Sequence, residues 1–307
     1  MREPMRRVSF KNMPKNFPKI TEKVIITKRE GNIFSVWLGR KYLEQYTDRE
    51  RICLLRNDLT HYSIRKATDV VGVKDFLIPF DDKSWSTSVI GLNKLVIQLY
   101  SKGLRGFLIP ITLGYTVGGT NDDLKGIINC LTDIKTKYKD IHLFYWIDAA
   151  LSGLVLPFIQ KDFRTFNFPE IHTFIVDFHK FAGVPYPAGL ILYRRSLRKL
   201  IEKDIPYIIQ KDNTLLGSRS GIAAISIWTL INSYAFKGFK KEAEICIQRK
   251  NIFLDKLKRD YPDIKIRTNR YSVAACLIIK KSLPLDLRQK FGMKSIKKSF
   301  LNNIFPI

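Results

Sequence analysis

The sequence predicts an α/β fold, in which a mainly parallel sheet lies between layers of helices. Three observations predict it. Short apolar runs recur along the chain, segments with apolar residues at helical spacing separate them, and 307 residues with 45% hydrophobic content suffice for one large domain or two small ones. Because continuous apolar runs are typical of strands covered on both faces, we expect parallel strands in the sheet.

The first half of the chain alternates between the two patterns. Apolar residues at near-helical spacing predict a helix over 31–46, and the run RICLLRN predicts a short strand over 51–57. A helix is expected over 61–71 and a strand over 105–114 (RGFLIPITLG). The segment from 121 opens with Asn and Asp, which are helix-start signals, and predicts another helix.

The second half begins with three strands and ends in a different pattern. Continuous apolar runs predict strands over 142–150, 172–178 and 188–194. The pattern then becomes helical from 220 to about 260. Residues 264–281 alternate enough to predict strands of a smaller terminal subdomain.

The net charge of +25, with a pI near 9.9, is the one extreme bulk property. Lys and Arg are spread along the chain, with higher density at 1–29, 194–203, 236–250 and 280–298. Without an aromatic-interleaved basic stripe, such runs favour solvated basic faces over a nucleic-acid groove, so no nucleic-acid partner is expected. The N-terminus lacks the apolar core of a secretory signal and no apolar run reaches 18 residues, so we expect a cytoplasmic protein without a membrane partner.

The cysteines and the glycine patterns argue against several site classes. Cys53, Cys130, Cys246 and Cys276 lie far apart, with no CxxC pair and no nearby histidine cluster, so neither a metal site nor a disulfide framework is expected. The chain has no GxGxxG or Walker pattern, which leaves a dinucleotide or nucleoside triphosphate site without support.

Polar residues gather where the predicted strands end. They are His61, Thr116, Asp148 followed by Ala150, and the pair His179 and Lys180. Taken alone, an aspartate after a strand is more often a cap or turn residue. Ligands bind outside the carboxyl ends of strands in such sheets, however, so the four sets together predict a cofactor site.

A lysine, a carboxylate and an imidazole at the ends of adjacent strands suit pyridoxal phosphate chemistry. A lysine amine forms a Schiff base with the aldehyde of this cofactor, a carboxylate keeps its ring nitrogen protonated, and a flat side chain stacks on the ring. The sequence therefore predicts pyridoxal 5'-phosphate as the cofactor.

Five motifs carry a resemblance to a known family. HYSIRKATDVVGV, ITLGYTVGGTNDDL, IDAALSGLVLPF, VDFHKFAGVPYPAG and GSRSG follow the order and rough spacing of the group II pyridoxal phosphate-dependent amino acid decarboxylases. The sequence most resembles the bacterial pyridoxal-dependent histidine decarboxylases, and PYPAG is also similar to archaeal tyrosine/aspartate decarboxylases. The resemblance runs from about residue 24 to about residue 280.

The resemblance implies a fold and a domain organisation. The fold is that of fold type I pyridoxal phosphate-dependent transferases, with a mainly parallel sheet in the large domain and a small C-terminal α+β subdomain. A basic segment would occupy 1–23, the cofactor-binding domain 24–220, and a helical connection with a shortened C-terminal subdomain 221–307. Members of the family act as homodimers, which implies a homodimer here.

The resemblance also implies residue roles. Lys180 would form the Schiff base, Asp148 would hold the ring nitrogen, and His61 would stack on the ring and assist proton transfer. Ala150 would lie beneath the opposite face of the ring, and His179 near the phosphate or carboxylate end.

Four further residues would belong to the same site. Thr116 would be a polar neighbour of the ring, and Arg219 in GSRSG would contact the cofactor region. The family's glycine-rich turn GGTEGN aligns with TKREGN (27–32), where Gly31 and Asn32 match and would be cofactor-binding.

The same turn contains departures from the family pattern. Thr27, Lys28 and Arg29 stand in place of two glycines and a threonine, and their side chains would crowd the space that glycines leave open. Tyr115 also replaces a threonine, and relative to the family the chain is short at both ends. Two functions therefore stay open: decarboxylation of a histidine-like or aromatic L-amino acid, or a truncated, catalytically inactive homologue with a binding role or none.

Overall fold

The computed structural model describes residues 20–25, 27–163, 165–166, 168–207, 211–217, 219–278 and 285–290. The strands are β1 (Ile20–Ile25), β2 (Ile52–Arg56), β3 (Lys74–Leu77), β4 (Phe80–Asp81), β5 (Ser86–Thr87), β6 (Gly106–Thr112), β7 (His142–Asp148), β8 (Ile171–Asp177), β9 (Gly189–Arg194), β10 (Lys203–Asp204), β11 (Lys211–Asp212), β12 (Lys265–Thr268) and β13 (Ala275–Ile278). The helices are α1 (Lys28–Leu43), α2 (Tyr62–Val71), α3 (Val89–Ser101), α4 (Leu124–Lys137), α5 (Leu156–Ile159), α6 (Gly221–Asp260) and α7 (Leu285–Lys290), with short 3₁₀ helices η1 (Arg49–Arg51) and η2 (Arg195–Leu200).

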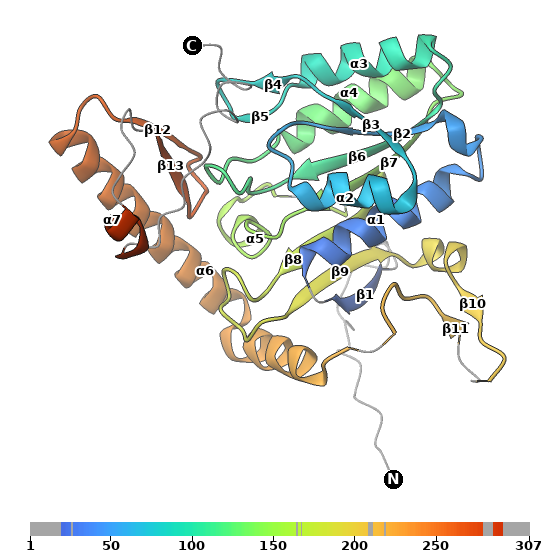
Figure 1. Cartoon of the computed structure of the whole chain (residues 1–307). Coiled ribbons are helices and arrows are strands. Elements are labelled where there is room, and N and C mark those ends of the chain that lie inside the picture. Colours follow the sequence, from blue (N-terminus) through green and yellow to red (C-terminus); the bar gives the residue numbers. More distant parts are fainter. Residues whose placement is uncertain are drawn as a thin grey trace.

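Seven strands form the central sheet, in the order β1-β9-β8-β7-β6-β2-β3 (Figure 1). The pairs from β8 to β3 are parallel, whereas β9 runs antiparallel to both β8 and β1. The predicted α/β fold with a mainly parallel sheet is confirmed. β9 differs from the continuous buried strand expected there, because its side chains alternate between buried and half-buried between β8 and the edge strand β1.

Helices cover both faces of the sheet and bury one apolar cluster on each (Figure 1). On one face α1 and α2 pack against β2, β6, β7 and β8, with Phe34, Leu38 and Ile64 among the buried side chains. On the other face α3 and α4 contribute Leu92, Val96 and Leu131, among others, to the second cluster. Burial at roughly 25 cal/mol per Å² of apolar surface makes these two clusters the main source of stability.

The helix α1 begins earlier than the predicted 31–46, because Thr27 caps it. The Thr27 hydroxyl accepts a hydrogen bond from the Arg29 backbone N–H at 3.0 Å, and the helix starts at Lys28. A Cβ on Gly39 would lie 2.5 Å from Leu108 Cδ2, so this glycine lets α1 approach the sheet closely. The close approach brings the first turn of α1 against the carboxyl ends of β7 and β8.

The C-terminal part combines α6 with the hairpin β12–β13 and α7. The predicted helical segment 220–260 is α6, and the strands predicted within 264–281 are β12 and β13, which pair antiparallel. Cys276 and Ile278 pack against a small cluster around Trp85 and Tyr115. The domain boundary at 220 stays a prediction. The basic segment 1–23 and residues 283–307 lie outside the described residues, apart from 20–23 and 285–290.

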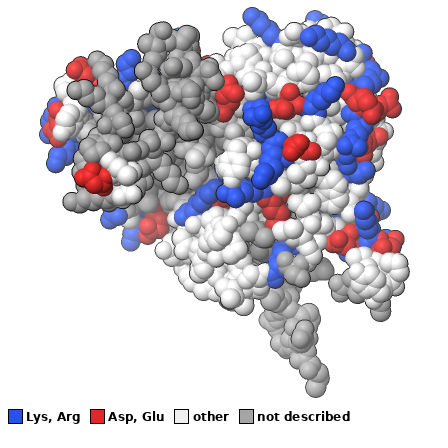
Figure 2. All heavy atoms as spheres, viewed as in Figure 1, with Lys and Arg blue, Asp and Glu red and all other residues white. Residues whose placement is uncertain are grey.

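Among the described segments, no helix combines the length and the apolar character needed to cross a membrane. Figure 2 shows Lys and Arg side chains in several separate places on one face of the molecule, with acidic side chains between them.

Candidate active site

Asp148 ends β7 in a buried position, with 1% of its surface exposed. Its Oδ2 accepts a hydrogen bond from Asn32 Nδ2 at 3.0 Å, and its Oδ1 accepts one from the Ala150 backbone N–H at 3.3 Å. Burial on its own would raise the pKa of Asp148, but the Lys28 ammonium and the Asn32 hydrogen bond outweigh it and hold the pKa below its usual value. Asp148 is therefore a buried carboxylate that keeps its negative charge.

Asn32, in the first turns of α1, holds Asp148 in its orientation. Its Oδ1 accepts a hydrogen bond from Trp146 Nε1 at 2.9 Å, and its Nδ2 also lies 3.0 Å from Ser63 Oγ. These bonds fix which end of the amide faces Asp148. Asn32 thus connects α1 to β7 and α2 by hydrogen bonds and positions the Asp148 carboxylate.

His61 caps the N-terminus of α2. Its Nδ1 accepts a hydrogen bond from the Ser63 backbone N–H at 3.3 Å and lies 2.8 Å from Ser63 Oγ. Burial, followed by the nearby Lys28 charge, lowers the pKa of His61 to about 4. The imidazole is therefore neutral at pH 7, and it lies close enough to Asp148 and Lys180 for both charges to act on it.

A polar network lies behind the turn that carries His61. Asn57 Oδ1 accepts hydrogen bonds from the Leu59 and Thr60 backbone N–H groups, and Asn57 Nδ2 donates to the Tyr115 hydroxyl at 2.6 Å. The Tyr115 hydroxyl in turn donates to Asp122 Oδ1 at 2.8 Å. Tyr115, which replaces a threonine of the family, is thus part of the support of the His61 turn.

Lys180 lies in the turn after β8, three residues beyond Asp177. Its Nζ is 2.7 Å from Asp177 Oδ2, and about a quarter of its side chain is exposed. Asp177 Oδ1 accepts a hydrogen bond from the Lys28 backbone N–H at 2.7 Å. Asp177 therefore joins the start of α1 to the lysine turn.

His179 points back into its own turn. Its Nδ1 lies 2.8 Å from the Ala188 carbonyl oxygen, while its Nε2 lies 3.7 Å from Asp177 Oδ2. The ring makes an edge contact with Tyr186. His179 is therefore adjacent to the cluster through Asp177.

The remaining predicted site residues have diverse surroundings. Ala150 is buried beside Asp148, whereas Thr116 is exposed in the turn after β6. Gly31 faces the sheet: a Cβ there would lie 2.8 Å from Ile25 Cδ1 and 2.9 Å from Ile175 Cγ2, so close packing accounts for this glycine. Arg219 pairs with Glu30 of α1 at 2.9 Å, which brings the GSRSG loop to the same helix end.

The sequence did not predict the position of the Lys28 side chain. It is 4% exposed, and its Nζ lies 3.7 Å from Asp148 Oδ2. In the sequence, Lys28 stands out because it replaces a residue of the family's glycine-rich turn, at 27–32. In the structure, its ammonium faces the carboxylate that is expected to hold the ring nitrogen. The neighbouring sequence does not predict that the Lys28 side chain points toward Asp148, because this orientation depends on how α1 crosses β7.

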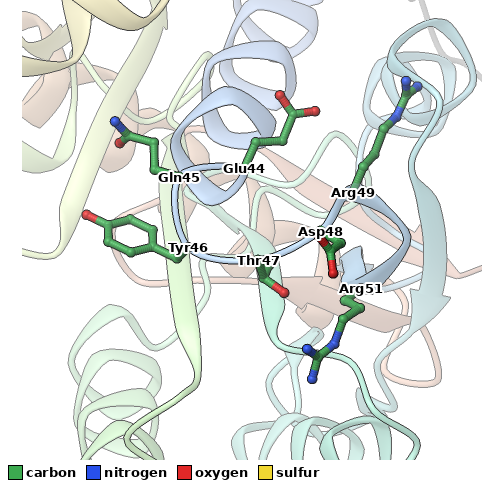
Figure 3. Close-up of a pocket in the computed structure, with 7 residues that line it drawn as sticks. All are labelled: Glu44, Gln45, Tyr46, Thr47, Asp48, Arg49 and Arg51. Atoms are coloured by element: carbon green, nitrogen blue, oxygen red, sulfur yellow. The ribbon is translucent and has the colours of Figure 1, made fainter.

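A separate cavity of about 480 Å³ lies at the other end of α1 (Figure 3). Its lining comes from the segment 44–51 and includes Glu44, Asp48 and Arg51. At 1.5 Å per residue, α1 extends for about 24 Å, so this cavity lies well away from Asp148. It does not belong to the cluster of predicted residues.

Comparison with protein families identifies one match over most of the chain. The pyridoxal-dependent decarboxylase conserved domain matches residues 39–280. A histidine decarboxylase from Vibrio campbellii is 29% identical over 231 residues, which cover 75% of this chain and 56% of the relative. A tryptophan decarboxylase from Clostridium sporogenes is 30% identical over 217 residues, covering 69% and 51% of the two chains. The chain therefore spans about half the length of these relatives.

Solved structures show the same fold. An L-methionine decarboxylase from Streptomyces sp. 590 superposes with a TM-score of 0.76 at 17% identity, covering 88% of this chain and 70% of the other. A rice (Oryza sativa) structure described as TDC with PLP and tryptamine has a TM-score of 0.70 at 14% identity and covers 84% and 56%. The predicted fold type I architecture is confirmed.

Proposed function

The chain belongs to the pyridoxal-dependent decarboxylase family, and from this premise we propose that it decarboxylates an L-amino acid to the amine and carbon dioxide with pyridoxal phosphate as cofactor. The observation that carries the proposal is the convergence of Asp148, His61 and Lys180 from three different elements at one edge of the sheet. Hydrogen bonds through Ser63 and Asn32 connect His61 to Asp148. Lys28 and Asp177 connect Asp148 to Lys180. The family uses this cofactor and acts on amino acids.

The chemistry of the clustered side chains suits three parts of the cofactor. A carboxylate that stays ionised suits a protonated ring nitrogen, a neutral imidazole suits the flat ring face, and a partly exposed amine suits the aldehyde. Asp148, His61 and Lys180 would supply them, with the small Ala150 beside Asp148. The start of α1 is the part that differs, because Lys28 already faces Asp148.

The bound cofactor would supply an electron sink that lets the carboxylate leave the amino acid as carbon dioxide. The protein's own share is electrostatic and steric. Asp148, fixed by Asn32 and the Ala150 N–H, would keep a negative charge at the ring nitrogen. His61, neutral and fixed by Ser63, would present a flat face and a nitrogen able to move a proton. Asp177 would orient the Lys180 amine.

The relatives support a substrate class. Several are histidine decarboxylases, one is a tryptophan decarboxylase, and two are serine decarboxylases. On the strength of the histidine and tryptophan decarboxylases, we propose a histidine-like or aromatic amino acid as substrate. Histidine and tryptophan both have a planar ring as side chain.

We also propose that the active unit is a homodimer. The first half of α6 exposes large apolar side chains at every third position: Ile222, Ile225, Trp228, Ile231 and Tyr234. Large apolar side chains exposed along one helix segment favour an interaction site, and a second copy is the occupant that the family resemblance supports.

Absorbance spectra after addition of pyridoxal phosphate test the function. We expect a band at roughly 400 to 430 nm, typical of the imine of this cofactor, which Lys180→Ala abolishes. Lys203→Ala, at an exposed lysine of β10, is the control and should keep the band. Release of carbon dioxide from histidine or tryptophan then identifies the substrate.

A second candidate function is a catalytically inactive homologue with a binding role or none. The observation that favours it is the Lys28 ammonium, which faces the carboxylate that the cofactor would need. It predicts that, after addition of the cofactor, the wild type, Lys180→Ala and Lys203→Ala all give the spectrum of the protein plus free cofactor. A band that depends on Lys180 would contradict it.

A further inference from the structure

Lys28 is held in place at both its backbone and its side chain. Its backbone N–H, the first of α1, donates to Asp177 Oδ1 at 2.7 Å. Its side chain is 5% exposed and ends 3.7 Å from Asp148 Oδ2, which is itself 1% exposed. The amine therefore lies inside the cluster rather than in solvent.

The ammonium of Lys28 is a major contributor to keeping Asp148 charged. A buried carboxylate needs a nearby cation or hydrogen-bond donors, and here Lys28 supplies the cation while Asn32 and Ala150 supply donors. The cluster is thus electrostatically satisfied by the protein's own side chains.

A protonated ring nitrogen at Asp148 would meet this cation. Two positive charges on one buried carboxylate repel each other strongly, since the surrounding protein screens them far less than water does. The Lys180 ammonium adds to the positive charge acting on Lys28. Lys28 and the ring nitrogen are therefore competitors for Asp148.

We propose that Lys28 is an internal counter-cation that holds Asp148 in the cofactor-free protein and must leave it when the cofactor binds, so that Lys28 limits the cofactor affinity. The inference rests on the proposed function, because it assumes that Asp148 receives the ring nitrogen. It assigns to Lys28 a role opposite to that of a phosphate ligand: removal of the amine strengthens binding.

Calorimetric titration of the full chain, freed of cofactor by dialysis, tests the inference. Two probes are used: pyridoxal phosphate, and pyridoxine phosphate, which lacks the aldehyde and so reports on the ring and phosphate alone. We expect Lys28→Met and Lys28→Gly to bind both probes about tenfold more tightly or better, the factor that corresponds to one pKa unit of relieved repulsion. Lys41→Met, on the same helix with 40% of its side chain exposed, is the matched control and should leave both affinities unchanged.

Thermal unfolding without cofactor gives a second readout. Lys28→Met leaves Asp148 buried without its cation, so its unfolding midpoint should fall below that of the wild type, while Lys41→Met should have little effect. Lower stability without cofactor together with tighter binding is the combination expected of a counter-cation.

The outcomes separate this inference from the proposed function. Equal or weaker binding of pyridoxine phosphate by Lys28→Met would overturn the counter-cation role, even if the imine band forms. Tighter binding of pyridoxine phosphate without any Lys180-dependent band would retain the counter-cation role and contradict the proposed function. Failure of every variant to bind either probe would overturn both.

Discussion

Asp148 and His61 show how burial and neighbouring charges set protonation in the cluster. Burial disfavours the charged form of both side chains, but only Asp148 has cations and donors that compensate. The carboxylate stays charged, whereas the imidazole, which has Lys28 and Lys180 as neighbours, stays neutral. The same two lysines thus favour the charged carboxylate and the neutral imidazole in the cofactor-free protein.

His172 is a second buried imidazole, and it has a structural role. Its Nδ1 accepts a hydrogen bond from the Tyr145 backbone N–H at 3.2 Å, and its ring stacks on Phe144. Burial, followed by the Arg194 charge, lowers the pKa of His172 to about 3. In the unfolded chain the imidazole titrates near its ordinary pKa of about 6.5.

We expect His172 to make the protein less stable as the pH falls below 6.5. Between its folded and unfolded pKa values the unfolded state binds more protons, so stability rises with pH in this window and is lost on acidification. From pH 6.5 to pH 5 the loss from His172 amounts to about 1 to 2 kcal/mol. Urea unfolding at several pH values measures it.

The variant His172→Asn isolates this contribution. Asparagine offers an oxygen where Nδ1 accepts the Tyr145 N–H, but it does not titrate, so the dependence of stability on pH should become shallower. His142→Asn, at the half-buried start of β7, is the control and should keep most of the slope. An unchanged slope in His172→Asn would assign the acid sensitivity to other groups, among them His61.

At the residue scale, sequence reasoning found the polar residues that follow strands but not those that support them. Asp148, His61 and Lys180 were recognisable because each follows an apolar run and matches a specific motif. The contacts of Asn32 with Trp146 and of Lys28 with Asp148 join positions more than one hundred residues apart. Such contacts depend on the packing of α1 on the sheet, which local pattern does not encode.

The helix α1 is the element that links the cluster to the sheet. It contributes Asn32 and Lys28 at its start, and it lies close to the sheet because Gly31 and Gly39 face it. Any added bulk at Gly39 pushes the helix away from Leu108 and Phe144, to which a Cβ would come within 2.5 and 2.6 Å. The position of the cluster therefore depends on a glycine some seven residues further along the helix.

We expect Gly39→Ala to lower the free energy of unfolding by about 1 to 3 kcal/mol, the usual cost of overpacking a core. The helix-propensity gain from alanine, about 1 kcal/mol, offsets part of this cost. Urea unfolding measures the change. Gly221→Ala, at a helical glycine with open space around its Cα, is the control and should be neutral or stabilising; equal effects of both substitutions would contradict the packing argument.

Element prediction succeeded where buried strands and long helices gave strong patterns. The runs that became β6, β7 and β8 are buried along their length, so their sequences are continuously apolar. α3 was missed, and so was the edge strand β3, whose two middle residues are half-buried between two exposed end residues. Whether an edge strand forms depends more on pairing with the adjacent strand than on its own composition, so its sequence predicts it poorly.

At the scale of the whole molecule, α6 carries the surface that we assign to a second copy. Trp228 is 58% exposed in the first half of this helix, and Phe253 is 56% exposed in the second half. The two aromatic side chains are matched in exposure and lie on either side of the kink at Ala235 in α6, but only Trp228 lies in the apolar segment that begins at Ile222.

We expect Trp228→Asp to raise the dissociation constant of the homodimer at least tenfold, as loss of a central aromatic anchor does. Sedimentation velocity over a range of protein concentrations measures it. Phe253→Asp should leave the dimer intact. Dissociation by both variants, or by neither, would place the subunit contact elsewhere.

The fold class of the whole molecule was predictable because many weak patterns agree, and the relative placement of α6 and the β12–β13 hairpin was not. Their contacts, such as Cys276 against the Trp85 cluster and Phe239 against Phe158, lie between segments distant in the sequence. The high positive charge was no guide to the fold either, since solvated lysines are compatible with most folds.

The hydrogen bond from Trp146 to Asn32 has a practical consequence. The chain contains four tryptophans, and the indole N–H of Trp146 is separated from Asp148 by the Asn32 amide alone. A change of charge or of binding partner at Asp148 therefore changes the strength of the hydrogen bond between the Asn32 amide and the indole N–H of Trp146. The fluorescence of Trp146 and the NMR signal of its indole N–H should therefore report, without any added label, whether a ligand is bound at Asp148.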